Sequence, residues 1–276
     1  MTGRSFSGQV AVVTGAASGL GAAAAWQLSA EGARVMVVDI DADGARMVAE
    51  SLPGESAWVQ ADVSSEADVA RYIAAAADRF GRIDLHHVNA GIPGTQAPLP
   101  DISLDEFDQV MNVNLRGSFL GVRAAFRQFR EQGSGGAIVI TASIASLRGS
   151  ADLLPYQISK HAVLGLLQGA AVYGGPLGIR VNAVAPGIVP TELFMARPGG
   201  KEDMERRART VPLRRAGQAS EIGSVVAFLL SDEAAYMTGS VVSVDGGAAA
   251  MSTVRASGGA GAWDTGPLDA YSGLSS

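Results

Sequence analysis

The chain has 276 residues, of which 47% are hydrophobic and 17% are charged, and its net charge is −6. This acidic balance, without a basic block, argues against nucleic acid and anionic membranes as partners. The absence of cysteine excludes disulfides and thiolate metal sites, and with only three histidines we expect no metal site.

The N-terminal residues lack the apolar stretch of a signal peptide, and no run of about 18 apolar residues occurs anywhere. We therefore expect a cytoplasmic protein with no membrane contact.

Short apolar runs alternate with Ala-rich helical stretches along the chain. In chain order, the pattern predicts a strand at 9–15, a helix at 19–32, a strand at 33–41, a helix at 41–54, a strand at 56–63, a helix at 65–81, a strand at 83–91, a helix at 104–132, a strand at 135–143, a helix at 155–173, and strands at 179–187 and 239–247. Continuous apolar strands separated by helices are typical of parallel sheets covered on both faces. We predict one α/β domain, a Rossmann-like, doubly wound sheet of seven parallel strands.

Two stretches depart from this alternation. Residues 188–215 mix apolar and charged residues, as a substrate lid does. Residues 251–276 are rich in Gly and Ser and have no helical or strand period, so we predict a domain over 1–250 followed by a C-terminal tail. Trp263 is a large apolar group in that tail, and we expect it to anchor the tail locally.

The first strand-to-helix connection reads TGAASGLG over residues 14–21. Gly15, Gly19 and Gly21 permit a tight turn and let a pyrophosphate approach the helix N-terminus. Asp39 ends the second strand, where a carboxylate accepts hydrogen bonds from ribose hydroxyls and repels a 2′-phosphate. No Arg or Lys occurs in residues 14–33. The pattern predicts a dinucleotide site and favours NAD over NADP.

Tyr156 and Lys160 are four residues apart in the stretch LLPYQISK, so on a helix their side chains lie on one face. A phenol has a pKa of about 10 and is a poor base at neutral pH. A neighbouring ammonium and the N-terminus of the helix both favour the phenolate. The pair therefore indicates a tyrosine that takes up or releases a proton.

Several short motifs accompany the glycine turn and the Tyr-Lys pair. They are ADV (61–63), NAG (89–91), VNL (113–115), TAS (141–143), PGIVPT (186–191) and VDGG (244–247). On these motifs, residues 7–247 resemble the short-chain dehydrogenase/reductase family.

The resemblance implies an oxidoreductase whose catalytic tetrad is Asn114, Ser143, Tyr156 and Lys160. Tyr156 would be the general base, Ser143 would hold the substrate oxygen, Lys160 would also bind the nicotinamide ribose, and Asn114 would hold a water that relays the proton. The implied cofactor contacts are Gly15, Ser18, Gly19, Leu20, Gly21, Asp39, Asp62, Val63, Asn89, Ala90, Gly91, Tyr156, Lys160, Pro186, Gly187, Val189 and Thr191.

The chain departs from the family after the fourth strand, where members usually read Asn-Asn-Ala-Gly. Here the sequence is Val88-Asn89-Ala90-Gly91, preceded by His86 and His87. Adjacent residues on a strand point to opposite faces, so we expect two buried histidines bonded to nearby backbone, or one in contact with cofactor or substrate. One of them would supply the hydrogen bond that the missing asparagine made.

The leading hypothesis is an NAD-dependent dehydrogenase of a secondary alcohol or its ketone. The alternatives are an NADPH-dependent 3-oxoacyl-type ketoreductase and a catalytically inactive dinucleotide-binding regulatory protein. The substrate wall is predicted to be mostly aliphatic, which favours an uncharged alicyclic, aromatic or medium-sized alcohol; its candidate residues are Ile144, Leu153, Phe194 and Met195.

Apolar residues exceed one buried stripe on the helices at 104–132 and 155–173. They are Met111, Phe119, Val122, Phe126, Val163, Leu166, Leu167 and Val172. Because exposed apolar patches mark interfaces, and because the resembling family pairs these two helices, we expect a homotetramer.

Overall fold

The computed structural model describes residues 4–149, 153–192 and 200–251. The predicted tail with Trp263, and Phe194 and Met195 of the predicted substrate wall, lie outside these ranges.

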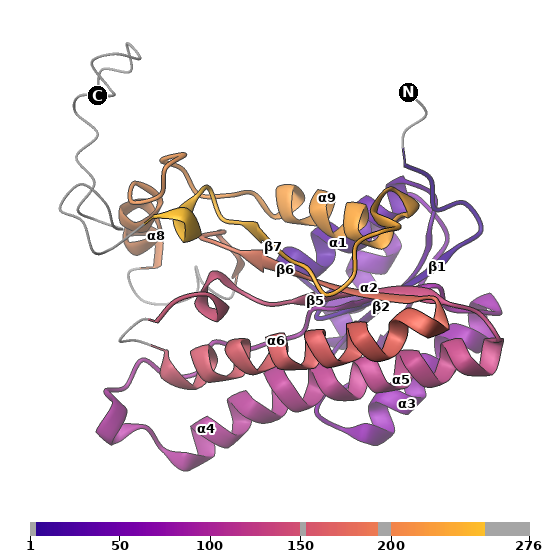
Figure 1. Cartoon of the computed structure of the whole chain (residues 1–276), viewed down its shortest axis with the longest axis horizontal. Helices are drawn as coiled ribbons and strands as arrows, with labels where there is room; N and C mark the ends of the chain where they lie inside the picture. Colours follow the sequence, from indigo (N-terminus) through magenta and orange to yellow (C-terminus); the bar gives the residue numbers. More distant parts are fainter. Residues whose placement is uncertain (1–3, 150–152, 193–199, 252–276) are drawn as a thin grey trace, which may run out of the picture.

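Seven parallel strands form one sheet in the order β3-β2-β1-β4-β5-β6-β7 (Figure 1). The strands are β1 (Val10–Thr14), β2 (Arg34–Asp39), β3 (Ser56–Gln60), β4 (Leu85–Val88), β5 (Gly136–Thr141), β6 (Ile179–Pro186) and β7 (Val241–Val244). The predicted fold is confirmed. Each strand is shorter at its carboxyl end than the apolar pattern suggested, because residues such as Gly15 and Asn89 leave the ladder to form loops.

Helices cover both faces of the sheet (Figure 1). One face carries α3 (Glu66–Phe80), α4 (Leu104–Met111), α5 (Gly117–Gln132) and α6 (Leu154–Gly174), and the other carries α1 (Gly19–Ala30), α2 (Ala42–Ser51) and α9 (Ala219–Leu230). Local signals fix the ends of α3: the Ser65 side chain accepts from the backbone N–H of Asp68, and Gly81 ends the helix at φ 84°. Two apolar cores result, one on each face of the sheet.

Helix α9 is absent from the elements predicted above, although the sequence carries a signal for it. The Glu221 carboxylate accepts from the backbone N–H of Gln218 at 2.8 Å, and the apolar run that follows packs on α1 and the sheet. A shorter helix, α8 (Gly200–Ala208), lies within the predicted lid region at 188–215.

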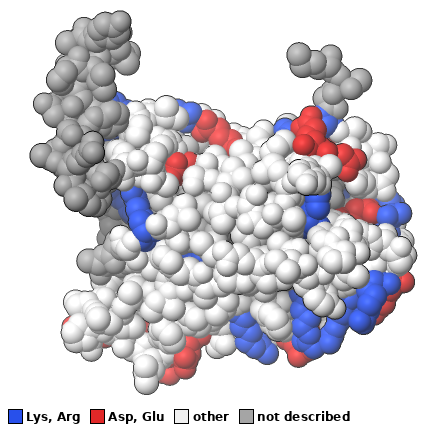
Figure 2. Space-filling view, in the orientation of Figure 1, with Lys and Arg blue, Asp and Glu red and all other residues white. Residues whose placement is uncertain are grey.

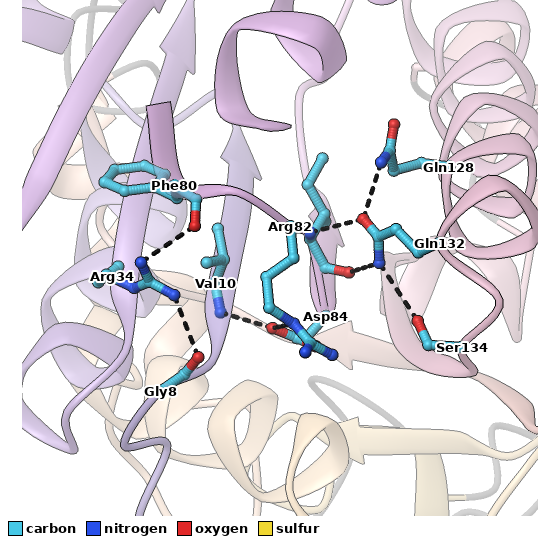
Figure 3. A network of polar contacts seen from close by, with 10 residues as sticks. Gly8, Val10, Arg34, Phe80, Arg82, Asp84, Gln128, Gln132 and Ser134 are labelled. Atoms are coloured by element: carbon cyan, nitrogen blue, oxygen red, sulfur yellow. Dashed lines mark hydrogen bonds and ion pairs between the residues drawn. The ribbon is translucent and has the colours of Figure 1, made fainter. Parts of the chain in front are cut away.

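The amino ends of β1 and β4 are joined by the polar network in Figure 3. Asp84 accepts from the backbone N–H of Val10 at 2.9 Å and from the Arg82 guanidinium. Gln132, the last residue of α5, donates to the Ile83 carbonyl and accepts from the Ile83 N–H, both at 2.8 Å. This network ties α5 to the sheet at the edge opposite the carboxyl ends of the strands.

Chain order reverses between β1 and β4, which are neighbours in the sheet. At such a switch point the loops after two adjacent strands turn to opposite faces and leave a crevice, where ligands of open α/β sheets bind. The loops after β1 and β4 flank this crevice, and those after β5 and β6 lie at the same edge of the sheet.

Candidate active site

The turn after β1 has no room for side chains at two of its glycines. A Cβ on Gly15, whose φ is 63°, would lie 2.7 Å from the Cα of Ala90, and a Cβ on Gly21 would collide with the Gly15 carbonyl oxygen. The exposed Ser18 precedes α1, which begins at Gly19. The backbone thus passes unusually close to the loop after β4, in a cradle that fits a pyrophosphate at a helix N-terminus.

Asp39 lies beside this turn at the end of β2. One carboxylate oxygen accepts from the backbone N–H of Ala17 at 2.9 Å, and the other accepts from that of Asp41 at 3.1 Å. Each carboxylate oxygen has a second acceptor site, so the group retains capacity for two ribose hydroxyls.

Asn89 holds the glycine turn from the other side. Its amide nitrogen donates to the carbonyl oxygens of Thr14 and Gly15, at 3.1 and 3.0 Å. Its amide oxygen accepts from the Thr141 hydroxyl at 3.0 Å. The Asn89 side chain therefore connects the carboxyl ends of β1, β4 and β5.

The segment after β3 places Asp62 and Val63 at the same edge of the sheet. The Asp62 carboxylate accepts from both the backbone N–H and the hydroxyl of Ser64. Val63 is buried and packs against Gly117 at the start of α5.

Helix α6 carries Tyr156 in its first turn, where an anion is stabilised by the helix dipole. Lys160 lies one turn further on, with its Nζ 5.6 Å from the centre of the Tyr156 ring. The ammonium donates to the Thr141 carbonyl oxygen at 2.7 Å. Burial lowers the pKa of Lys160 to about 8, because the charged form is desolvated. Tyrosine and lysine are thus brought together as predicted.

Asn114 lies in a π-helical turn, Asn112–Arg116, that joins α4 to α5. Its amide oxygen accepts from the Ile92 N–H at 2.8 Å, and its amide nitrogen donates to the Ile92 carbonyl and to the Ser159 hydroxyl. A Cβ on Gly91 would lie 3.2 Å from the Asn114 amide oxygen and 3.5 Å from Lys160 Nζ. Asn114 therefore links the loop after β4 to the helix of Tyr156 and Lys160.

Ser143 follows β5 and is buried. Its hydroxyl oxygen accepts from the backbone N–H of Ala145 at 3.1 Å, which leaves the hydroxyl hydrogen available to donate. Ile144 is half-buried in the turn that follows. Leu153, immediately before α6, has a φ of 53°, a left-handed conformation that strains a leucine by about 1–2 kcal/mol.

The loop after β6 closes the site near α1. A Cβ on Gly19 would lie 3.3 Å from Thr191 Cγ2, and one on Gly187 would lie 2.6 Å from the Cα of Asp245. Pro186 ends β6, and Val189 is buried. Behind this loop is a hollow of about 390 Å³, lined by residues that include Ile188, Val211, Leu213, Glu221, Ile222 and Asp245.

His86 and His87 point to opposite faces of β4, as predicted, and both are fully buried. Their partners are side chains rather than backbone: His86 Nε2 lies 3.3 Å from the Tyr72 hydroxyl, and His87 Nε2 lies 2.9 Å from the Thr141 hydroxyl. The expectation of backbone partners was therefore wrong. Val88 packs in the core beneath α5.

Sequence reasoning assigned no role to the hydroxyls of Thr14, Thr141 and Ser159. Each bonds a predicted site residue: Thr14 accepts from the Asn89 N–H, Thr141 donates to the Asn89 amide, and Ser159 accepts from Asn114. Their only sequence signal is a small hydroxyl residue at the end of an apolar strand or beside a catalytic motif. Over the described ranges, no cluster of His, Asp and Glu forms a candidate metal site.

A family model described as Enoyl-(Acyl carrier protein) reductase matches residues 15–249. The chain belongs to the short-chain dehydrogenase/reductase family. It is therefore a member of a family of dinucleotide-dependent oxidoreductases that use NAD(H) or NADP(H). None of the helices in the described ranges combines the length and apolar character that a membrane span requires.

Several curated relatives are similar to this chain, and two of the three below are named for six-membered rings. Levodione reductase of Leifsonia aquatica is 42% identical over 89% of this chain and 96% of its own length. Cis-4-hydroxycyclohexanecarboxylate dehydrogenase of Sinomonas cyclohexanicum is 40% identical over 90% and 100%. The 2,5-dichloro-2,5-cyclohexadiene-1,4-diol dehydrogenase of Sphingobium indicum is 36% identical over 89% and 98%.

The fold agrees with a solved structure of such a relative. The crystal structure of levodione reductase superposes with a TM-score of 0.85 at 41% identity, covering 89% of this chain and 99% of that one. The likeness thus extends over nearly the whole relative.

Proposed function

We propose that this protein is an NAD-dependent dehydrogenase that interconverts a cyclic secondary alcohol and its ketone. The observation that carries the proposal is the placement of Lys160 between Tyr156 and the end of β5, the strand that leads into Ser143. In the proposed mechanism the Tyr156 phenol and the Ser143 hydroxyl act on one substrate oxygen, and the Lys160 ammonium acts on the phenol. The glycine cradle beside Asp39 supplies room for the dinucleotide.

A bound nicotinamide supplies the hydride acceptor for oxidation and the hydride donor for reduction. In oxidation, Tyr156 takes the hydroxyl proton of the alcohol onto its phenolic oxygen, and in reduction it returns that proton. Ser143 donates its hydroxyl hydrogen to the substrate oxygen and so orients it. Lys160, when charged, favours the phenolate form of Tyr156 and thereby makes the phenol a base near neutral pH.

We assign the remaining roles as the family resemblance implies them. Asn114, bonded to Ile92 and Ser159, fixes the loop beside Lys160 and holds the water through which the proton leaves. Lys160 also reaches the nicotinamide ribose. The β6 loop with Val189 and Thr191 contacts the nicotinamide amide, and Asp62 and Val63 contact the adenine.

The choice of NAD over NADP rests on Asp39. Its carboxylate lies at the turn that would hold the adenosine ribose, where a 2′-phosphate would meet a like charge. Residues 14–33 carry no Lys or Arg to offset that repulsion.

The substrate class rests on two observations. Two relatives named for hydroxylated six-membered rings are 36% and 40% identical to this chain. The described candidates for the substrate wall are aliphatic: Ile144 directly follows Ser143, and Leu153 comes just before the helix of Tyr156. A six-membered ring with a secondary hydroxyl fits both.

The test is a steady-state assay at the NADH absorbance with cyclohexanol, substituted cyclohexanols and cyclohexanediols, using NAD+ and NADP+ in parallel. Open-chain alcohols of equal carbon number are the matched controls. We expect NAD+-dependent oxidation of ring alcohols with the higher kcat/KM. Preference for NADP+, or reduction of 3-oxoacyl thioesters with NADPH alone, would overturn the assignment. Cofactor binding with no turnover of any alcohol or ketone would point to a regulatory protein instead.

A further inference from the structure

Thr141 is the meeting point of three site contacts that come from three different elements. Its carbonyl oxygen accepts from Lys160 of α6, and its hydroxyl lies 3.0 Å from the Asn89 amide oxygen and 2.9 Å from His87 Nε2. Through Asn89, this one residue is connected to the glycine turn after β1. His87 is the buried end of the chain of contacts.

The direction of each hydrogen bond follows from the acceptors at the far end. The Asn89 side chain must present its nitrogen to the carbonyl oxygens of Thr14 and Gly15, so its oxygen faces Thr141. The Thr141 hydroxyl must then donate its single hydrogen to that oxygen. The short contact with His87 consequently requires a hydrogen on His87 Nε2.

The burial of His87 agrees with this protonation. Desolvation, with a smaller effect from neighbouring His86, lowers the pKa of His87 to about 3, so the ring is neutral at pH 7. The other ring nitrogen, Nδ1, has no hydrogen-bond partner within the described ranges. When the hydrogen is on Nε2, Nδ1 carries only a lone pair and no hydrogen. The opposite tautomer would bury an N–H donor without an acceptor, which costs more.

We propose that His87 is a positioning residue for cofactor binding: its Nε2–H fixes the Thr141 hydroxyl, which fixes the Asn89 amide and through it the glycine turn. The proposal rests on the proposed function only in taking that turn as the cofactor cradle. Val88 packs in the core, where it has no polar group to orient Thr141 or Asn89. His87 supplies that orientation from one strand residue earlier.

His86 provides a matched control, because it lies on the same strand and is equally buried. It contacts Tyr72 beneath α3, on the opposite face of the sheet from His87. A His86→Leu substitution removes a buried histidine without touching Thr141. Any effect of His87→Leu that His86→Leu does not reproduce is therefore specific to the connection with Asn89.

The first experiment measures the Kd for NADH by titration calorimetry. Loss of one hydrogen bond gives roughly a five- to tenfold rise for His87→Leu, and His86→Leu stays within about twofold of wild type. His87→Gln keeps a donor nitrogen, so its Kd stays close to that of wild type. Thr141→Ser keeps the hydroxyl, so its Kd also stays close to that of wild type. The KM for NAD+ rises in His87→Leu while kcat changes little, because the base and the substrate oxygen site are intact.

A double substitution tests whether His87 acts through Thr141. If it does, His87→Leu adds nothing to the Kd of Thr141→Val, since the hydroxyl it orients is already gone. Independent, additive losses would overturn the proposal, as would wild-type affinity in His87→Leu or equal losses in the two histidine variants. If His87→Leu does not fold, Thr141→Val against Thr141→Ser carries the same comparison.

The tautomer itself is read by nitrogen-15 long-range spectra of histidine-labelled protein without cofactor. The chain has three histidines, and the two leucine variants assign His86 and His87. We expect a protonated Nε2 and a bare Nδ1 on His87 from pH 5 to 8. A proton on Nδ1 would refute the proposal. Because this measurement needs neither cofactor nor substrate, it separates failure of the positioning role from failure of the proposed function.

Discussion

Lys160 Nζ lies 2.7 Å from the carbonyl oxygen of Thr141, so the helix of the Tyr-Lys pair is fastened to the end of β5 by a buried ammonium. Desolvation outweighs this hydrogen bond, because the pKa of Lys160 is lowered from 10.5 to about 8. Lys160 therefore binds its proton more weakly in the folded protein than in the unfolded chain.

This lowered pKa predicts a specific dependence of stability on pH. Between about pH 8 and 10.5 the unfolded chain binds the lysine proton and the folded protein does not, so the free energy of unfolding rises with pH. The stability gained with neutral Lys160 is lost as pH falls from 10.5 to about 8, and the full loss is about 3 kcal/mol. Urea unfolding of wild type and Lys160→Met, at several values from pH 7 to 10.5, isolates it. We expect the variant's advantage to shrink with rising pH, and a constant difference would contradict the prediction.

The Tyr156→Phe substitution removes only the phenolic oxygen. We expect kcat to fall by several orders of magnitude because the proton acceptor is lost, while the Kd for NADH stays near that of wild type. Lys160→Ala, in contrast, should impair both, since the ammonium supports the phenolate and reaches the ribose. Parallel steady-state kinetics and calorimetric titrations distinguish the two variants. Substantial turnover by Tyr156→Phe would mean that another group carries the proton.

The sheet and the position of the main motifs are predictable from sequence, because apolar strands and glycine turns are local signals. The helix over residues 104–132 was expected as one unit, and the structure inserts the π-helical turn at Asn114 within it. No propensity marks that turn, since it depends on the contacts of Asn114 with Ile92 and Ser159. Helix α9 was missed although its apolar run is visible in the sequence.

The polar connections of the site depend on tertiary structure. Thr141 and Asn89 are 52 positions apart, and only the pairing of β4 with β5 brings them together. The sequence suggested that a histidine compensates for the missing asparagine, yet it did not say which of the two faces the site. Strand alternation places His86 and His87 on opposite faces of the sheet. Only the structure shows that His86 faces Tyr72 and that His87 faces Thr141.

Asp39 is expected to set the preference between the two dinucleotides. Asp39→Ala should raise kcat/KM with NADP+ relative to NAD+, because it removes a like-charge repulsion of about 1 kcal/mol or more. The carboxylate also accepts from the Ala17 N–H, so alanine disturbs the turn as well. Asp39→Asn is the matched variant, since it keeps an acceptor oxygen and loses the charge. An unchanged cofactor ratio in both variants would show that selectivity comes from elsewhere.

Gln132 should matter for stability rather than for chemistry. Its side chain bonds both backbone groups of Ile83 at the amino edge of the sheet (Figure 3). Gln132→Ala leaves that donor and acceptor without their partner, which predicts a loss of about 2 kcal/mol in the free energy of unfolding. Gln128→Ala, which removes only a side-chain contact to Gln132, should cost less than about 0.5 kcal/mol. Denaturant unfolding measures both, and equal losses would count against the Ile83 contacts as the cause.

Only some of the residues that suggested an assembly are exposed. Val122, Val163 and Leu167 lie in the core, so they are not available to an interface. Phe119 of α5 and Val172 of α6 are 49% and 80% exposed. The face in Figure 2 also has few charged side chains over α6 and β7. Large exposed apolar side chains on an uncharged face are typical of subunit contacts.

We therefore propose a homotetramer in which α5 and α6 form a two-fold contact, and we expect a mass four times the 28.2 kDa of one chain by light scattering at micromolar concentration. Glutamate at both Phe119 and Val172 should lower that mass to a dimer or a monomer, because each interface copy would bury like charges. Met47→Glu is the matched control, since Met47 is 62% exposed on α2, away from these helices. A wild-type mass of 28.2 kDa would refute the tetramer, and an unchanged mass in the double variant would place the contact on another face.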